Sequence, residues 1–129
     1  MPQLSKRTAL AGCAAAAITL VVAAPAASGG QAAKPKTTKI TVADDFFSPS
    51  EAKVKAGDKV QWLWASDNSD THNVALTSTH PKGVKASDYR SGDAAVQYKY
   101  TAKFTVPGKY GFICTYHKTV MKTTLTVKK

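Results

Sequence analysis

The sequence predicts an all-β protein, a β-sandwich of about seven or eight strands, on the basis of two observations. From Thr37 onward, short segments of alternating apolar and polar residues are separated by clusters of Gly, Pro, Asp and Asn. Segments with the 3.6-residue periodicity of a helix are scarce over the same part of the chain. Alternation buries one face of each strand and leaves the other in water, so the strands are expected to pack as two sheets around one core.

The alternation predicts strands at residues 37–43, 51–55, 59–65, 72–76, 96–106, 109–114 and 123–127. The strand at 59–65 is expected at the centre of the core because Val60, Trp62 and Trp64 share one face. Residues 77–96 lack clean periodicity, and we expect loops there with at most one helical turn.

The N-terminus has the order of a secretory signal peptide. Lys6 and Arg7 precede an apolar, uncharged run over residues 8–24, and small residues follow it. A membrane span is the alternative, but this Ala-rich run is short against the ~20 residues that cross a bilayer. We therefore expect a cleaved signal peptide over residues 1–27 and an exported protein.

The remainder of the chain divides into a short linker and one domain. Residues 28–36 are small, polar and rich in Pro and Gly, which predicts a flexible linker, and residues 37–129 are expected to form the domain. Cys13 fits a lipoprotein processing box, although most of the apolar segment follows it, so lipidation and the export route stay open.

The chain is strongly basic, with a formal net charge of +10. Removal of the leader would leave 16 Lys and Arg against 8 Asp and Glu, a balance of +8. This charge can simply keep a sheet protein soluble, or it can attract an acidic redox partner or anionic polymers of the cell envelope. Nucleic acid is disfavoured as a partner because the lysines are dispersed and no recognition element is evident.

Four side chains suggest a metal centre. Cys114, His117 and Met121 lie within eight residues, and His72 lies upstream. Each of them alone is more often a core or sheet residue, but a thiolate, two imidazoles and a thioether together suit a soft, redox-active metal such as copper. A structural zinc site is disfavoured because thioether is a poor zinc ligand. His80 matches no ligand position and is expected in a surface loop.

The same residues carry a family resemblance. Residues 110–117 (Tyr-Gly-Phe-Ile-Cys-Thr-Tyr-His), Met121 and residues 71–74 (Thr-His-Asn-Val) resemble the cupredoxins, in particular the plastocyanin, pseudoazurin and amicyanin group. The resemblance implies a Greek-key cupredoxin fold and one type 1 copper per chain. It implies His72, Cys114 and His117 as ligands, Met121 as a weak axial ligand, and Asn73 as a hydrogen-bonding partner beside the thiolate.

The chain departs from the family pattern around the axial ligand. Three residues separate His117 from Met121, whereas plastocyanins and pseudoazurins have four and amicyanins two. Family members often carry Pro before that histidine and Gly after the methionine, but this chain has Tyr116 and Lys122. The loop shape therefore cannot be copied from a relative.

The expected function is single-electron transfer between redox proteins by Cu(I)/Cu(II) cycling through the exposed edge of His117. The partners are expected to have acidic docking surfaces, the protein to be a monomer, and its location to be periplasmic, extracellular or associated with the cell envelope. A copper carrier or storage protein with the same site is the alternative. An enzyme is not expected, because multicopper enzymes need more imidazoles, a binuclear copper centre needs a second thiolate, and no oxyanion motif accompanies Cys114.

Overall fold

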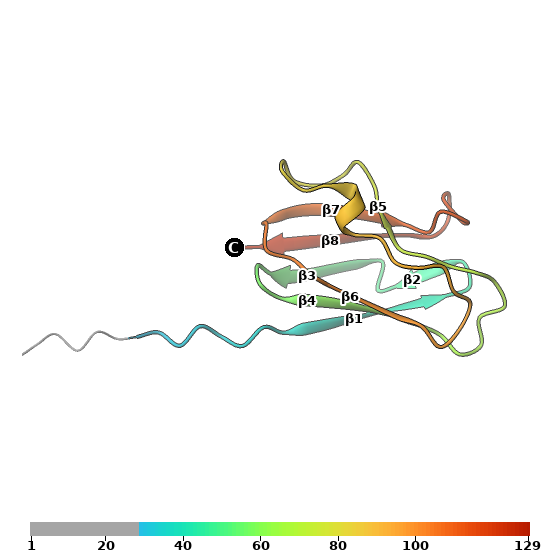
Figure 1. Cartoon of the computed structure of the whole chain (residues 1–129), viewed down its shortest axis with the longest axis horizontal. Helices are drawn as coiled ribbons and strands as arrows, with labels where there is room; N and C mark the ends of the chain where they lie inside the picture. The colour runs from blue at the N-terminus through green and yellow to red at the C-terminus, as the bar shows by residue number, and fades with distance from the viewer. Residues whose placement is uncertain (1–28) are drawn as a thin grey trace, which may run out of the picture. The chain divides into compact units, whose positions relative to one another are not determined.

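The computed structural model describes residues 29–129 (Figure 1). The predicted signal peptide, residues 1–27, lies outside these described residues. Residues 33–129 form one compact unit, and residues 29–36 carry no helix or strand and are exposed to solvent. In the described part of the chain, no helix has the length and apolar character needed to cross a bilayer.

The domain consists of two four-stranded sheets packed face to face, as Figure 1 shows. The first sheet has the order β2-β1-β4-β6 and the second the order β3-β8-β7-β5. The strands are β1 (Thr37–Ala43), β2 (Phe46–Ser48), β3 (Glu51–Lys55), β4 (Lys59–Trp64), β5 (Ala75–Leu76), β6 (Lys99–Lys103), β7 (Gly108–Ile113) and β8 (Lys122–Lys128). The chain moves repeatedly from one sheet to the other, so the predicted all-β sandwich is confirmed.

The core lies between the two sheets and is built by alternation along each strand. In β4, which lies between β1 and β6, Val60, Trp62 and Trp64 are buried, as expected of the central strand. The Trp62 ring stacks on Tyr100, with 5.4 Å between the ring centroids. It packs edge-to-face against Phe112, with 5.1 Å between the centroids. Aromatic rings from both sheets therefore pack against one another at the middle of the sandwich.

The structure differs from the sequence expectations mainly in strand length. The segment predicted as a strand at 72–76 is paired as a strand only at β5, while His72 forms a single isolated bridge with Ala94. The predicted strand at 96–106 is reduced to β6. The expectation of at most one helical turn within 77–96 is met by the 3₁₀ turn η1 (Ala86–Asp88).

Strand β2 was missed by the sequence analysis. Its three residues are too few to establish an alternation, and it is paired with β1 across a tight turn in which Asp45 has a φ of 68°. Such a positive φ is uncommon for residues other than Gly, although Asp and Asn are enriched there.

Strand register places the candidate metal loop at one end of the sandwich. Ile113, the last residue of β7, pairs with Lys122, the first residue of β8, so residues 114–121 connect the two strands at this end. We call it the loop end. Lys55 of β3 pairs with Lys128 of β8 at the opposite end, which we call the basic end.

Candidate metal centre

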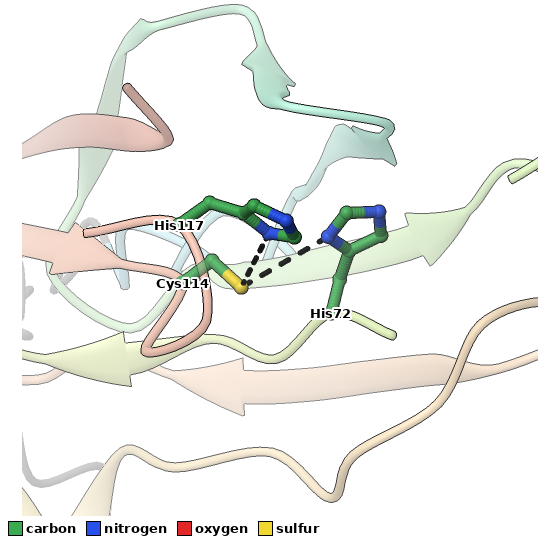
Figure 2. Close-up of side chains that lie close together, drawn as sticks. All are labelled: His72, Cys114 and His117. Atoms are coloured by element: carbon green, nitrogen blue, oxygen red, sulfur yellow. Dashed lines mark hydrogen bonds between the residues drawn. The ribbon is translucent and has the colours of Figure 1, made fainter. Parts of the chain in front are cut away.

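Three of the four predicted ligands converge at the loop end (Figure 2). The Sγ atom of Cys114 lies 3.9 Å from Nδ1 of His72 and 3.7 Å from Nδ1 of His117. One potential ligand atom from each of the three residues lies within 4.8 Å of the others. His72 approaches from the segment before β5, whereas Cys114 and His117 share the connection between β7 and β8.

These separations suit a single metal ion between the three side chains. With the bond lengths known for zinc, a neighbouring first-row metal, of about 2.3 Å to a thiolate and about 2.05 Å to an imidazole, an angle of about 120° would separate sulfur from nitrogen by about 3.8 Å. The two observed separations, 3.7 and 3.9 Å, bracket that value. The residues present therefore fit a copper ion in both donor chemistry and spacing.

Backbone hydrogen bonds close the loop that carries Cys114 and His117. The N–H of His117 donates to the carbonyl of Cys114 at 3.2 Å, and the N–H of Met121 donates to the carbonyl of His117 at 2.9 Å. The N–H of Cys114 donates to the carbonyl of Met121 at 3.1 Å and completes the ring. Two consecutive tight turns thus bring the thiol and the imidazole together and return the chain to β8.

Met121 lies at the foot of this loop and is fully buried among the core residues. Burial of an unbranched thioether is equally suited to core packing and to a weak axial contact. Its role as the axial ligand stays a prediction.

Asn73 connects the two segments that carry the ligands. Its side-chain oxygen accepts a hydrogen bond from the N–H of Thr115 at 2.8 Å, and its amide donates to the Thr115 hydroxyl at 2.7 Å. Its backbone N–H points at the sulfur of Cys114, 3.5 Å away. The amide also donates to Asp93 at 2.8 Å, and this bond, followed by one from Tyr116, lowers the pKa of the Asp93 carboxyl. The side chain is fully buried.

Asp44 contacts a predicted ligand and was missed by the sequence analysis. Its carboxylate lies 2.8 Å from Nε2 of His72, and it also accepts hydrogen bonds from the backbone and hydroxyl of Ser69. These contacts, the bond from His72 first, hold the pKa of Asp44 far below its ordinary value. An Nε2–H that donates to Asp44 leaves the lone pair of Nδ1 directed toward Cys114, which is the tautomer a metal ligand needs.

Two further carboxylates flank the outer edge of His117. Its Nε2 lies 3.6 Å from Asp45 and 3.9 Å from Asp70, and the exposed fractions of these side chains are 63% and 61%. The His117 side chain is itself 22% exposed, whereas His72 and Cys114 are fully buried. One imidazole edge therefore connects the buried cluster with solvent.

His80 lies outside the cluster, as the sequence analysis expected. It occupies the loop after β5, where its Nδ1 lies 3.1 Å from the carbonyl of Pro81, and it is partly buried. The cluster of metal-ligating residues in the described chain contains the other two histidines.

Comparison with known proteins agrees with this geometry. Residues 35–128 match the family described as copper binding proteins, plastocyanin/azurin family. The chain is 33% identical over 106 residues to amicyanin-alpha from Methylorubrum extorquens, covering 81% of this chain and 83% of that protein. This chain belongs to the plastocyanin/azurin family of copper binding proteins. It is also 34% identical over 86 residues to plastocyanin from Scenedesmus fuscus, covering 64% of this chain and 86% of that relative.

Solved structures share the cupredoxin fold. An oxidized mutant of amicyanin is 24% identical, with a TM-score of 0.58, and the match covers 70% of this chain and 80% of that one. A Cu-containing nitrite reductase from Thermus scotoductus is 21% identical, with a TM-score of 0.62, over 83% of this chain and 26% of that chain. At these identities the likeness concerns the fold alone. The family membership and the cluster of one thiol and two imidazoles identify copper as the cofactor of this cupredoxin.

Proposed function

We propose that this cupredoxin is an exported single-electron shuttle that uses the Cu(I)/Cu(II) couple of one type 1 copper. His72, Cys114 and His117 would hold the ion, with Met121 as a weak axial ligand. One observation carries the proposal: two of the three clustered side chains are fully buried, and the third exposes only an imidazole edge, 22% of its side chain. Such a site is accessible to an electron but closed to a bulky substrate.

The residues around the cluster suit repeated oxidation and reduction. When bound, copper supplies the one-electron couple. The ring of backbone bonds from Cys114 to Met121 and the Asn73 bridge to Thr115 hold the loop in one arrangement. Asp44 fixes the ring of His72 through a 2.8 Å hydrogen bond. Ligands held in this way need little rearrangement when the charge of the metal changes, which favours fast electron transfer.

Burial favours the shuttle over the alternative of a copper carrier. Transfer of the ion to an acceptor protein requires incoming ligands to replace Cys114 and His72, and both of these are fully buried. Their release would need the 114–121 loop to open, and four backbone hydrogen bonds among its own residues close that loop. An electron needs only the exposed edge of His117.

The proposed partners are redox proteins that dock at this edge. The positive net charge supports the proposal that an acidic partner is attracted at long range. At short range, however, Asp45 and Asp70 flank the imidazole, so we do not propose a uniformly acidic contact surface. Lys118 offers the complementary local contact for an acidic group. We propose a monomer that does not act as an enzyme and that is periplasmic, extracellular or associated with the cell envelope.

The test is spectroscopy and voltammetry of the copper-loaded protein. We expect an intense absorption band near ~600 nm, typical of thiolate bound to Cu(II), and reversible one-electron reduction. Cys114→Ser should abolish the band, because the thiolate is its source. The matched control is His80→Asn, which alters a histidine outside the cluster and should leave both properties unchanged.

Two results would contradict the proposal. If Cys114→Ser kept the band, the thiolate assignment would be wrong. If the copper-loaded protein were not reversibly reduced but passed its ion readily to an apo acceptor, the carrier alternative would replace the shuttle.

A further inference from the structure

A groove lined by lysines lies at the basic end of the sandwich, away from the candidate metal centre. Its volume is about 500 Å³. The residues that line it are Ala33, Lys34, Lys36, Thr38, Lys53, Val54, Lys55, Asp58 and Lys128. In the first sheet it is bordered by the start of β1, and in the second by the ends of β3 and β8. Basic side chains therefore surround the groove from both layers of the sandwich.

The positive charge of this groove is only partly compensated, because five lysines line it against one carboxylate. All five of its lysines are exposed, and none forms an ion pair within residues 29–129. Asp58, the single acidic residue of the lining, accepts hydrogen bonds at 2.9 Å from the backbone N–H groups of Lys36 and Lys55. Its carboxylate thus fixes the relative position of two lysine-bearing segments. Asp58 offsets one of the five positive charges, and the excess of four repels itself unless a further anion lies in the groove.

We propose that this groove binds a linear polyanion that carries a phosphate in each repeat. Lysine binds phosphate as a point charge, and several lysines around one concavity can contact successive phosphates of a chain. The concave shape favours a narrow chain, because a flat bilayer would reach only the rim. The loop end stays free, so polymer binding and electron exchange through His117 do not compete.

The test measures binding of fluorescently labelled inorganic polyphosphate by fluorescence anisotropy, with apo and copper-loaded protein. The groove variant combines Lys36→Gln, Lys53→Gln and Lys55→Gln, and the matched control combines Lys82→Gln, Lys85→Gln and Lys99→Gln. Both remove three positive charges from exposed side chains. We expect the groove variant to lose about tenfold or more in affinity and the control less than about threefold. A plot of log K against log salt concentration has a negative slope, and its magnitude should decrease by about two to three for the groove variant alone. Each lost phosphate contact contributes about 0.7–0.9 to that magnitude.

Three outcomes would overturn the proposal. Equal losses in both variants would mean that net charge alone drives binding. Binding to vesicles of phosphatidylglycerol and phosphatidylcholine that depends on the groove, without binding of polyphosphate, would replace the polymer with a membrane surface. Absence of polyphosphate binding at physiological salt would leave the groove without this ligand.

A fold control accompanies each variant. The thermal midpoint and the visible band should match those of the unaltered protein. A Gln at position 36 or 55 keeps the backbone N–H that donates a hydrogen bond to the Asp58 carboxylate. The binding assay also works with apo protein, so failure of the copper assignment would not affect it.

Discussion

His72 shows how single residues determine the chemistry of the loop end. Its imidazole is fully buried, with Nδ1 facing the sulfur of Cys114 and Nε2 facing Asp44. A carboxylate behind a histidine ligand orients the ring and makes it a stronger donor. Asp44 is 28 residues away in the sequence, in the turn after β1.

The first prediction concerns this carboxylate. Asp44→Asn should lower copper affinity by about 10–100-fold, the usual cost of losing such a partner. The reduction potential should rise, because the negative charge near the metal favours Cu(II) over Cu(I). Competition titration and voltammetry measure the two effects, and ¹⁵N chemical shifts of the Cu(I) form report the His72 tautomer. Asp88→Asn, at an exposed acidic residue in η1, is the control. If the two variants had the same copper affinity and reduction potential, Asp44 would not support His72 in the way proposed.

The second prediction concerns the axial position. Met121→Leu should keep copper and the visible band but raise the reduction potential, because a thioether supports Cu(II) more than an aliphatic side chain does. Similar volumes should limit the loss of folding stability to less than about 1.5 kcal/mol. Val120→Leu, at the exposed neighbouring position, is the control. An unchanged potential in Met121→Leu would show that the methionine only fills the core.

Much of the candidate site could be predicted from the sequence because Cys114, His117 and the proposed axial residue Met121 lie in one short loop. Their backbone hydrogen bonds are local, so sequence spacing alone limits where the side chains can be. Asp44, Asp45 and Asp70 gave no such signal, because each is an ordinary polar turn or loop residue until the fold brings it to a histidine.

At the scale of elements, β4 organises the core through Trp62. The indole is fully buried against rings of both sheets, and its Nε1–H is the buried side-chain donor of the described residues that finds no hydrogen-bond partner. Trp64 differs, since its Nε1–H donates to the carbonyl of His72 at 3.3 Å. Two tryptophans of one strand therefore have different roles.

This difference gives the third prediction. Trp62→Ala should lower the free energy of unfolding by about 3–5 kcal/mol through loss of packing. Trp62→Phe should cost clearly less, because a ring remains and an unpaired buried N–H, a burden of about 1–3 kcal/mol, is removed. Urea unfolding of the apo protein measures both. Trp64→Phe is the comparison, because it removes the hydrogen bond to the carbonyl of His72. In the copper-loaded protein this variant should shift the visible band, whereas Trp62→Phe should leave the band unchanged.

The fourth prediction concerns the turn before β4. Asp58 accepts backbone bonds from Lys55 and Lys36, and these hold its pKa below the ordinary 3.8. A lowered pKa contributes stability that is complete above the unfolded value and is lost as the pH falls toward the folded one. The free energy of unfolding of the apo protein should thus decline below about pH 4. The free energy of unfolding of the Asp58→Asn variant should decline less over this range. An identical decline in both proteins would contradict the assignment of this effect to Asp58.

At the scale of the whole molecule, charge is divided between the two ends of the sandwich. The basic end carries Lys34, Lys36, Lys53, Lys55 and Lys128 around its groove. The loop end has Asp44, Asp45 and Asp70 close to the histidines. Net charge, which is all that composition reports, conceals this division.

The fifth prediction follows from the acidic surroundings of His117. The double variant Asp45→Asn with Asp70→Asn should react faster than the unaltered protein with ferricyanide, an anionic oxidant, and slower with a cationic cobalt complex. Asn tolerates the positive φ of Asp45, so the turn should be retained. Stopped-flow rates at low and high salt measure the effect, which salt should weaken. If the double variant and the unaltered protein reacted at the same rate with each oxidant, electrons would not leave by this edge.

The sequence by itself determined the all-β class, the core faces of the strands and the loop that carries the candidate ligands Cys114, His117 and Met121. These features depend on periodicity and spacing within a few residues, which the chain carries directly. The tertiary structure decided that Asp44 hydrogen-bonds to His72, that His117 alone of the three clustered side chains reaches solvent, and that lysines from both sheets surround one groove. Those arrangements depend on how two sheets pack and on strand register, which bring together residues that no local pattern relates.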